Sequence, residues 1–119
     1  MAWEVEYTDQ FGNWFESLDE DQQESVVIAV EVLQEHGPGL GRPLVDTIKG
    51  SRHANMKELR PRRGKLRILF AFDPRRMAIL LIGGDKTSRW QAWYQDIIPL
   101  ADRLCDEHLE TLRKEGLLP

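Results

Sequence analysis

The chain has only one cysteine, Cys105, among its 119 residues. A single thiol excludes an intramolecular disulfide and any zinc site built from several cysteines. No apolar run reaches the roughly 18 residues that a membrane-spanning helix needs, so we expect no membrane association. The opening residues, MAWEVEYTD, contain neither a basic segment nor an apolar one. We therefore expect no signal peptide and a cytoplasmic location.

Recognisable metal and nucleophile motifs are also missing. The three histidines, His36, His53 and His108, are far apart in the sequence, and no set of His, Asp and Glu has metal-ligand spacing. Ser51 and Ser88 lie in no recognisable nucleophile turn. These gaps predict a protein without a metal or other cofactor and without a serine nucleophile.

Basic residues are absent from the first 36 positions, which hold ten acids. Residues 53–90 reverse the balance, with ten Lys/Arg against three acids, although the net charge of the chain is −4. Such a local concentration of positive charge suits an anionic partner, because local potential governs binding more than net charge does. It equally suits a strand edge protected against aggregation, and charge alone does not decide between the two.

The N-terminal third predicts one strand followed by two helices. Residues 3–7 alternate apolar and acidic side chains, as a half-buried strand does. Apolar spacing then predicts helices over 8–18 and 19–37, the first capped by Thr8 or Asp9 and the second ended by Gly37. The buried stripe expected on the second helix comprises Val26, Val27, Ala29, Val30 and Leu33.

The rest of the chain predicts a β-meander and closing helices. A Gly- and Pro-rich loop fills 37–53, and strands follow at 53–60, 65–73 and 77–84, joined by the turns PRRG and DPRR. A short helix comes next, and Pro99 is expected to break the pattern and begin a C-terminal helix over about 99–116. The prediction is one α+β domain over 1–119, with a small antiparallel sheet packed against the two N-terminal helices.

Alternation along the predicted hairpin places three charged side chains together. If Leu59 packs against the helices, Glu58 and Arg60 point to the opposite sheet face, and Arg67 of the next strand points there too. We expect that face to be open. Two guanidinium groups beside a carboxylate form a site that could bind phosphate and its transition state. A cross-strand ion pair that serves only solubility, worth about 0–1 kcal/mol, would give the same pattern.

The segment GGDKTSRWQAWY, residues 83–94, combines cations and aromatic rings after the last strand. Lys86 and Arg89 could contact phosphate, and an aromatic ring could stack on a base. We expect Trp93 to lie in the core and Tyr94 to be the functional ring. The candidate RNA-binding residues are then Lys57, Arg62, Arg63, Lys65, Arg89 and Tyr94.

The motif set KELR, RILFAF and LLIGGDKT, with this order of elements, resembles the RelE/ParE superfamily of bacterial toxins, and within it the HigB-like, phage-derived branch. The resemblance spans roughly residues 1–98. It implies a toxin of a type II toxin–antitoxin system that cleaves mRNA without a metal, in a ribosome-dependent reaction. In such enzymes the 2′-hydroxyl of the RNA attacks the adjacent phosphate and leaves a cyclic phosphate. It also implies a cognate antitoxin, HigA-like and carrying a helix-turn-helix.

The resemblance assigns roles to individual residues. Arg67 corresponds to the phosphate-stabilising arginine, Arg60 to the arginine that closes the ELR strand, and Lys86 to a basic residue after the last strand. Tyr94 corresponds to the aromatic residue of the following helix. Glu58 stands where some relatives have lysine, and it could act as a general base for the 2′-hydroxyl. The catalytic set expected is therefore Arg67, Arg60, Lys86 and Glu58.

Two other functions remain open from the sequence. A ParE-like toxin shares the fold but inhibits DNA gyrase by binding, and it does not need arginines on the sheet face. A phage-derived interaction module without toxicity is the other. The acidic helices and acidic C-terminal segment also differ from very basic ribosome-binding members of the superfamily.

Overall fold

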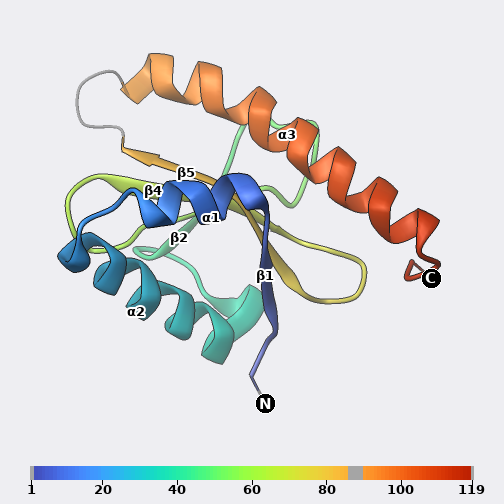
Figure 1. The fold of residues 1–119 in the computed structure, drawn as a ribbon, viewed down its shortest axis with the longest axis horizontal. Helices are drawn as coiled ribbons and strands as arrows, with labels where there is room; N and C mark the ends of the chain where they lie inside the picture. The colour runs from blue at the N-terminus through green and yellow to red at the C-terminus, as the bar shows by residue number, and fades with distance from the viewer. Residues whose placement is uncertain (1, 86–89, 119) are drawn as a thin grey trace.

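The computed structural model describes residues 2–85 and 90–118. One five-stranded sheet, in the order β1-β5-β4-β3-β2, has helices on both faces (Figure 1). Strand β1 pairs in parallel with β5, and the other neighbours are antiparallel. This is the predicted α+β class.

The strands are β1 (Val5–Tyr7), β2 (Val45–Thr47), β3 (Lys57–Leu59), β4 (Leu66–Phe72) and β5 (Ala78–Asp85). The helices are α1 (Asp9–Glu16), α2 (Glu20–His36), η1 (Gly37–Gly39, a 3₁₀ turn) and α3 (Trp90–Lys114).

The N-terminal helices begin and end where the sequence predicts. The Thr8 hydroxyl accepts a hydrogen bond from the Phe11 N–H at 3.0 Å and so caps α1. Asp19 forms a capping box with Gln22 at the start of α2. Gly37 ends α2 with a φ of 59°, a left-handed value that glycine tolerates.

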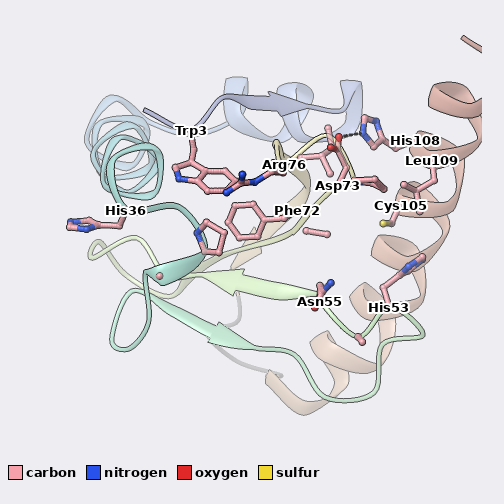
Figure 2. Close-up of a pocket in the computed structure, with 16 residues that line it drawn as sticks. Trp3, His36, His53, Asn55, Phe72, Asp73, Arg76, Cys105, His108 and Leu109 are labelled. Carbon is pink, nitrogen blue, oxygen red and sulfur yellow. Dashed lines mark hydrogen bonds and ion pairs between the residues drawn. The ribbon is translucent and has the colours of Figure 1, made fainter. Parts of the chain in front are cut away.

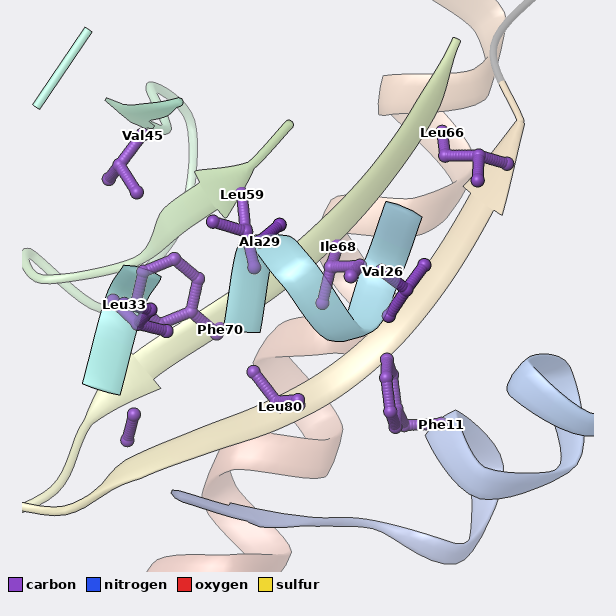
Figure 3. Close-up of a cluster of buried hydrophobic side chains, with 11 residues drawn as sticks. Phe11, Val26, Ala29, Leu33, Val45, Leu59, Leu66, Ile68, Phe70 and Leu80 are labelled. Atoms are coloured by element: carbon purple, nitrogen blue, oxygen red, sulfur yellow. The ribbon is translucent and has the colours of Figure 1, made fainter. Parts of the chain in front are cut away.

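One face of the sheet packs on α1 and α2 and forms the first hydrophobic core (Figure 3). Phe70 and Ile68 of β4 are completely buried there, together with Leu59 of β3. Leu33 of α2 covers them. The predicted inward-facing residues of β4 therefore do pack on the helices. The prediction for Val27 was wrong: its side chain is 46% exposed.

The opposite face is not open, which corrects the prediction made for it. Helix α3 lies along it and builds a second core in which Leu69 and Leu81 of the sheet meet Ala101, Leu104 and Cys105 (Figure 1). The sequence pattern failed here because Pro99 suggested two separate helices, whereas α3 continues through it. Pro99 is exposed, so its ring points to solvent while the apolar stripe runs on beneath it.

Two boundaries also differ from the prediction. Strand β2 lies inside the segment expected to be a loop, where three residues pair with β3 (Val45 with Leu59, Thr47 with Lys57). Strand β3 is correspondingly shorter than the strand predicted over 53–60. Three-residue edge strands carry too little alternation to be recognised in a sequence. Among the described helices, none is long and apolar enough to cross a membrane.

Two adjacent glycines in β5 allow tryptophans to pack against the sheet from both sides. A Cβ atom at Gly83 would lie 2.3 Å from the ring of Trp14 in α1, and one at Gly84 would lie 2.6 Å from Nε1 of Trp93 in α3. Both contacts are too close for any side chain, so the GG pair of the motif fixes the approach of both helices.

We expect Gly83→Ala to lower the free energy of unfolding by about 1–3 kcal/mol, because the Trp14 ring must move to admit the methyl group. Gly39→Ala is the matched control, since a Cβ there meets nothing within 4 Å; its expected effect is within about 0.5 kcal/mol. Urea unfolding monitored by circular dichroism measures both. Equal midpoints for the two variants would contradict the packing role of Gly83.

Candidate active site

The sheet register places the predicted charged residues on one face. Glu58 of β3 lies opposite Leu69 of β4, and Arg67 is two residues from Leu69 along the same strand. Residues two apart on a strand share a face, so Glu58 and Arg67 point to the α3 side of the sheet, as predicted. Because α3 covers that side, Glu58 is only 4% exposed and the group is an enclosed site.

The Glu58 carboxylate is the centre of this group. The Tyr94 hydroxyl of α3 donates to Glu58 Oε1 at 2.7 Å and lies 2.9 Å from Oε2. The Nε atoms of Arg67 and Arg60 lie 3.2 and 3.4 Å from the same Oε1. A buried carboxylate is thus held between two guanidinium groups and one phenol, which come from three different elements.

The two arginines still have unused hydrogen-bonding capacity. Arg60 Nε and Arg67 Nε are buried, and neither makes a hydrogen bond of acceptable geometry within the described part of the chain. Their distances to Glu58 satisfy an ion pair, but the directions of the N–H groups do not satisfy a hydrogen bond. Buried donors without a well-placed acceptor are rare and costly, so each one calls for an explanation. A ligand that supplies the missing acceptor is one such explanation.

Neighbouring groups fix the orientation of each arginine. Arg67 also donates from Nη1 to the Leu66 carbonyl at 2.7 Å, which anchors its planar head beside the strand. Arg60 donates from Nη2 to Asp46 of β2 at 3.2 Å. Hydrogen bonds from Arg42 and from the Thr47 N–H lower the pKa of Asp46, so this carboxylate remains a charged partner for Arg60.

Tyr94 is held in its neutral form. Burial raises its pKa, and the hydrogen bond to Glu58 raises it further, because both favour the protonated phenol. The phenol can therefore act as a hydrogen-bond donor throughout the physiological pH range. Its ring packs edge-on against Trp93, with the ring centroids 4.9 Å apart.

A pocket of about 600 Å³ opens beside Glu58, Arg60 and Tyr94. Sequence reasoning missed much of its lining, because β2 was taken for a loop and the first turns of α3 were read only for their aromatic residues. The additional lining residues are Thr47, Ile48, Lys49, Gln91, Gln95 and Ile98.

The other predicted RNA-binding residues do not join this group. Lys57 pairs with Phe70 and so lies on the opposite sheet face from Glu58. Arg62, Arg63 and Lys65 lie in the exposed connection between β3 and β4, where Arg63 pairs with Asp21 of α2 at 3.1 Å. Lys86 and Arg89 lie outside the described residues.

The structure brings the scattered histidines together in a second pocket of about 710 Å³, which Cys105 also lines (Figure 2). His108 lies 3.0 Å from Asp73 Oδ2, and His53 lies 2.8 Å from Asp106 Oδ1. Burial raises the pKa of the Cys105 thiol to about 11, so it is not a thiolate at neutral pH. This pocket could not be predicted from the sequence, because its histidines come from α2, a loop and α3.

Two further polar contacts lie near this pocket, one between α3 and the β2–β3 connection and one between β1 and the β4–β5 turn. Ser51, for which the sequence suggested no partner, donates to the buried Asp102 of α3 at 2.5 Å. Arg75 lies 2.8 Å from the Asp73 carboxylate and also pairs with Glu6 of β1. Glu6, Asp73 and His108 are close enough to share a cation. Arg75 already neutralises both carboxylates, however, so we assign this cluster a structural role.

Asp73 should make stability depend on pH. Burial alone would raise its pKa, but hydrogen bonds from Arg75 and His108 outweigh burial and hold the pKa below its ordinary value of 3.8. A lowered pKa contributes stability above the unfolded pKa and loses it as pH falls through the folded value. We therefore expect the free energy of unfolding to decline below about pH 4.

The variant Asp73→Asn should be less stable at pH 7 by about 1–3 kcal/mol, and this difference should shrink as the pH falls toward 3. Urea unfolding at a series of pH values measures it, with the exposed Asp96→Asn as control. A difference that stayed constant from pH 7 to pH 3 would contradict the role assigned to Asp73.

The chain is similar in sequence to proteins of a known family. Residues 13–106 match the family described as phage-derived protein Gp49-like. Two candidate toxins of Mycobacterium tuberculosis are similar in sequence. HigB2 is 50% identical over 112 residues, covering 92% of this chain and 55% of HigB2. HigB3 is 50% identical over 100 residues, covering 84% of this chain and 88% of HigB3. The chain thus spans about half the length of HigB2.

Solved structures of RelE toxins share the fold at low sequence identity. RelE in the RelE–RelB complex of Pyrococcus horikoshii has a TM-score of 0.59 at 16% identity, covering 74% of this chain and 99% of that one. The isolated Escherichia coli RelE toxin has a TM-score of 0.60 at 10% identity, covering 81% and 99%. Identities this low speak for the fold alone. The Gp49-like match and the HigB relatives show that the chain belongs to the phage-derived, Gp49-like family of HigB proteins, and it has the fold of the RelE toxins.

Proposed function

We propose that this protein is the toxin of a type II toxin–antitoxin system and that it cleaves mRNA on the ribosome without a metal. The observation that carries the proposal is the group of Glu58, Arg60, Arg67 and Tyr94. The Nε atoms of both arginines are buried and, among the described residues, form an ion pair with Glu58 without a hydrogen bond of good geometry. Guanidinium groups bind phosphate in a fork and stabilise the charge of a phosphorane. The names of the HigB relatives support the toxin assignment.

The reaction follows from the roles these groups can fill. The 2′-oxygen of the RNA attacks the adjacent phosphorus, and Glu58 accepts its proton as general base. Arg67 and Arg60 stabilise the negative charge on the non-bridging oxygens, and Tyr94 holds the Glu58 carboxylate in place through its hydrogen bond. The bond from phosphorus to the 5′-oxygen breaks, which leaves a 2′,3′-cyclic phosphate. The 5′-oxygen takes up one proton, for which Lys86 is the candidate donor.

The proposed protein partner is a cognate antitoxin. Several solved RelE structures are complexes of the toxin with its antitoxin RelB. The helix-turn-helix expected for a HigA-like partner comes from the resemblance in sequence. No observation in this structure favours gyrase inhibition or a non-toxic module over RNA cleavage.

The experiment is induction of the chain alone in a bacterial host, with protein synthesis measured and transcript 5′ ends mapped, beside Arg67→Ala. Arrest of translation with new transcript ends, absent in the variant, is the expected result. Arrest of translation with intact transcripts would overturn the assignment as a nuclease and favour a ParE-like toxin. Soluble protein without arrest of translation would overturn the assignment as a toxin.

A further inference from the structure

An apolar groove on the α1–α2 side lies away from the candidate active site, on the other face of the sheet. Its volume is about 500 Å³, and β1, α1 and α2 line it. Tyr7 and Val27, two of its lining side chains, are 64% and 46% exposed. The neighbouring Ile28 is 53% exposed. Large apolar side chains exposed together usually mark a surface that a partner covers.

The groove is shaped by a glycine. The Tyr7 ring lies against α1 at Gly12, where a Cβ would come within 3.3 Å of Tyr7 Cε2. The ring also packs on Phe11, with the centroids 5.7 Å apart. Tyr7 is therefore a fixed wall of the groove and presents a rigid aromatic surface, the kind of residue that anchors protein interfaces.

Acidic side chains surround this apolar surface. Glu24 lies one turn of α2 before Val27 and Ile28, and Glu31 lies one turn after them. Both glutamates are exposed. Glu16 of α1 also lines the groove. None of these three carboxylates has an ion pair with a described residue. The surface therefore offers apolar contacts with unneutralised negative charge on either side.

We propose that this groove binds an amphipathic helix of a protein partner, apolar on one side and rich in Lys and Arg on the other. Helix-in-groove recognition uses apolar anchors at i, i+3, i+4 and i+7, which suit a groove of this size, and the acidic rim selects basic flanking residues. RNA and anionic membranes are disfavoured by the same acids. A second copy would have to present its basic β3–β4 connection, whose residues Arg62, Arg63, Gly64 and Lys65 include no apolar anchor.

We identify the protein that carries this helix as the neutralising antitoxin, and this identification rests on the proposed function. The protein would then contact its antitoxin on the sheet face opposite Glu58. The binding surface itself does not depend on toxicity, so it can be tested on the purified chain.

The probe is a synthetic helical peptide of about 14 residues with Leu at the four anchor positions and Lys elsewhere. One comparison peptide replaces Lys with Glu, and another scrambles the Leu positions. Titration into isotope-labelled protein, followed by NMR, reports both affinity and location. We expect the basic amphipathic peptide alone to bind, with shift changes centred on Tyr7, Val27 and Ile28 and weakened by salt.

Two double variants sharpen the test. Val27→Ser with Ile28→Ser should weaken binding about tenfold or more, and because both side chains are exposed the fold should be retained. Glu24→Lys with Glu31→Lys should abolish the preference for the basic peptide. Asp96→Lys with Glu107→Lys on α3 changes the net charge equally and should leave binding unchanged.

Equal binding of the Glu peptide, shift changes on another surface, or no binding at all would overturn the proposal. Self-association in sedimentation experiments that vanished in the Val27 and Ile28 variant would also overturn it, in favour of a dimer interface. If the chain bound the peptide but did not arrest translation, the proposal for this surface would stand and the proposed toxin function would be refuted.

Discussion

Replacing Arg67 with alanine is expected to reduce the single-turnover rate of mRNA cleavage by about 10²–10³-fold, which is the usual cost of removing one group that stabilises transition-state charge. The measurement uses purified protein with ribosomes carrying a defined mRNA. Arg67 is held in a fixed orientation, because it contacts both the Leu66 carbonyl and Glu58.

Two companion variants separate chemistry from folding. Arg67→Lys keeps the charge but loses the planar fork, and it should recover only a small part of the rate. Arg103→Ala, on the exposed side of α3, removes an arginine whose one ion pair with a described residue is to Glu107, and it should cleave at the wild-type rate. Thermal unfolding identifies any variant that is not folded. A folded Arg67→Ala protein with wild-type activity would contradict the phosphate-binding role.

Glu58→Gln is expected to lower the same rate by about 10²–10⁴-fold, with little change in the affinity for the programmed ribosome. The amide preserves the shape of the side chain and can still accept the Tyr94 hydrogen bond, but it cannot take the proton of the 2′-hydroxyl. A general base acts on the chemical step, so the loss should appear in the rate at saturating substrate.

The matched control for Glu58→Gln is Tyr94→Phe, which removes one hydrogen bond to Glu58 and leaves the carboxylate charged. We expect a smaller loss, about tenfold. If Glu58→Gln instead weakened substrate binding and left the rate constant unchanged, Glu58 would only position Arg60 and Arg67. The simple ion-pair interpretation of the sequence would then be the correct one.

The sequence predicted the elements with strong local signals. The cap at Thr8, the end of α2 at Gly37 and the inward set of β4 all appear in the structure. The strand predicted over 3–7 is present only at Val5–Tyr7, and Tyr7, which alternation placed on the buried face, is 64% exposed. The placement of Glu58 and Arg67 on one face also followed from alternation alone, because a strand has only two faces. The nature of the site could therefore be predicted, although its surroundings could not.

The wrong predictions share a physical cause: contacts between distant parts of the chain decided the outcome, and local sequence patterns do not show such contacts. Pro99 was expected to break the helix, but the apolar stripe of α3 gains more from covering the sheet than one missing hydrogen bond costs. Val27 has helical spacing with the core residues, yet it points outward, and only the structure shows this. Asp46 was missed because its role depends on β2, whose three residues are an ordered strand only through pairing with β3.

The Glu58 carboxylate gives Arg60 and Arg67 a permanent internal counter-ion. An RNA phosphate must compete with this tethered anion, which is always present at the site and which salt cannot dilute. The competition lowers affinity for any phosphate that arrives alone, and it favours RNA that other contacts already hold in place, as the ribosome holds its mRNA. We therefore expect the proposed nuclease to spare free transcripts, because the Glu58 side chain already occupies part of the phosphate-binding site.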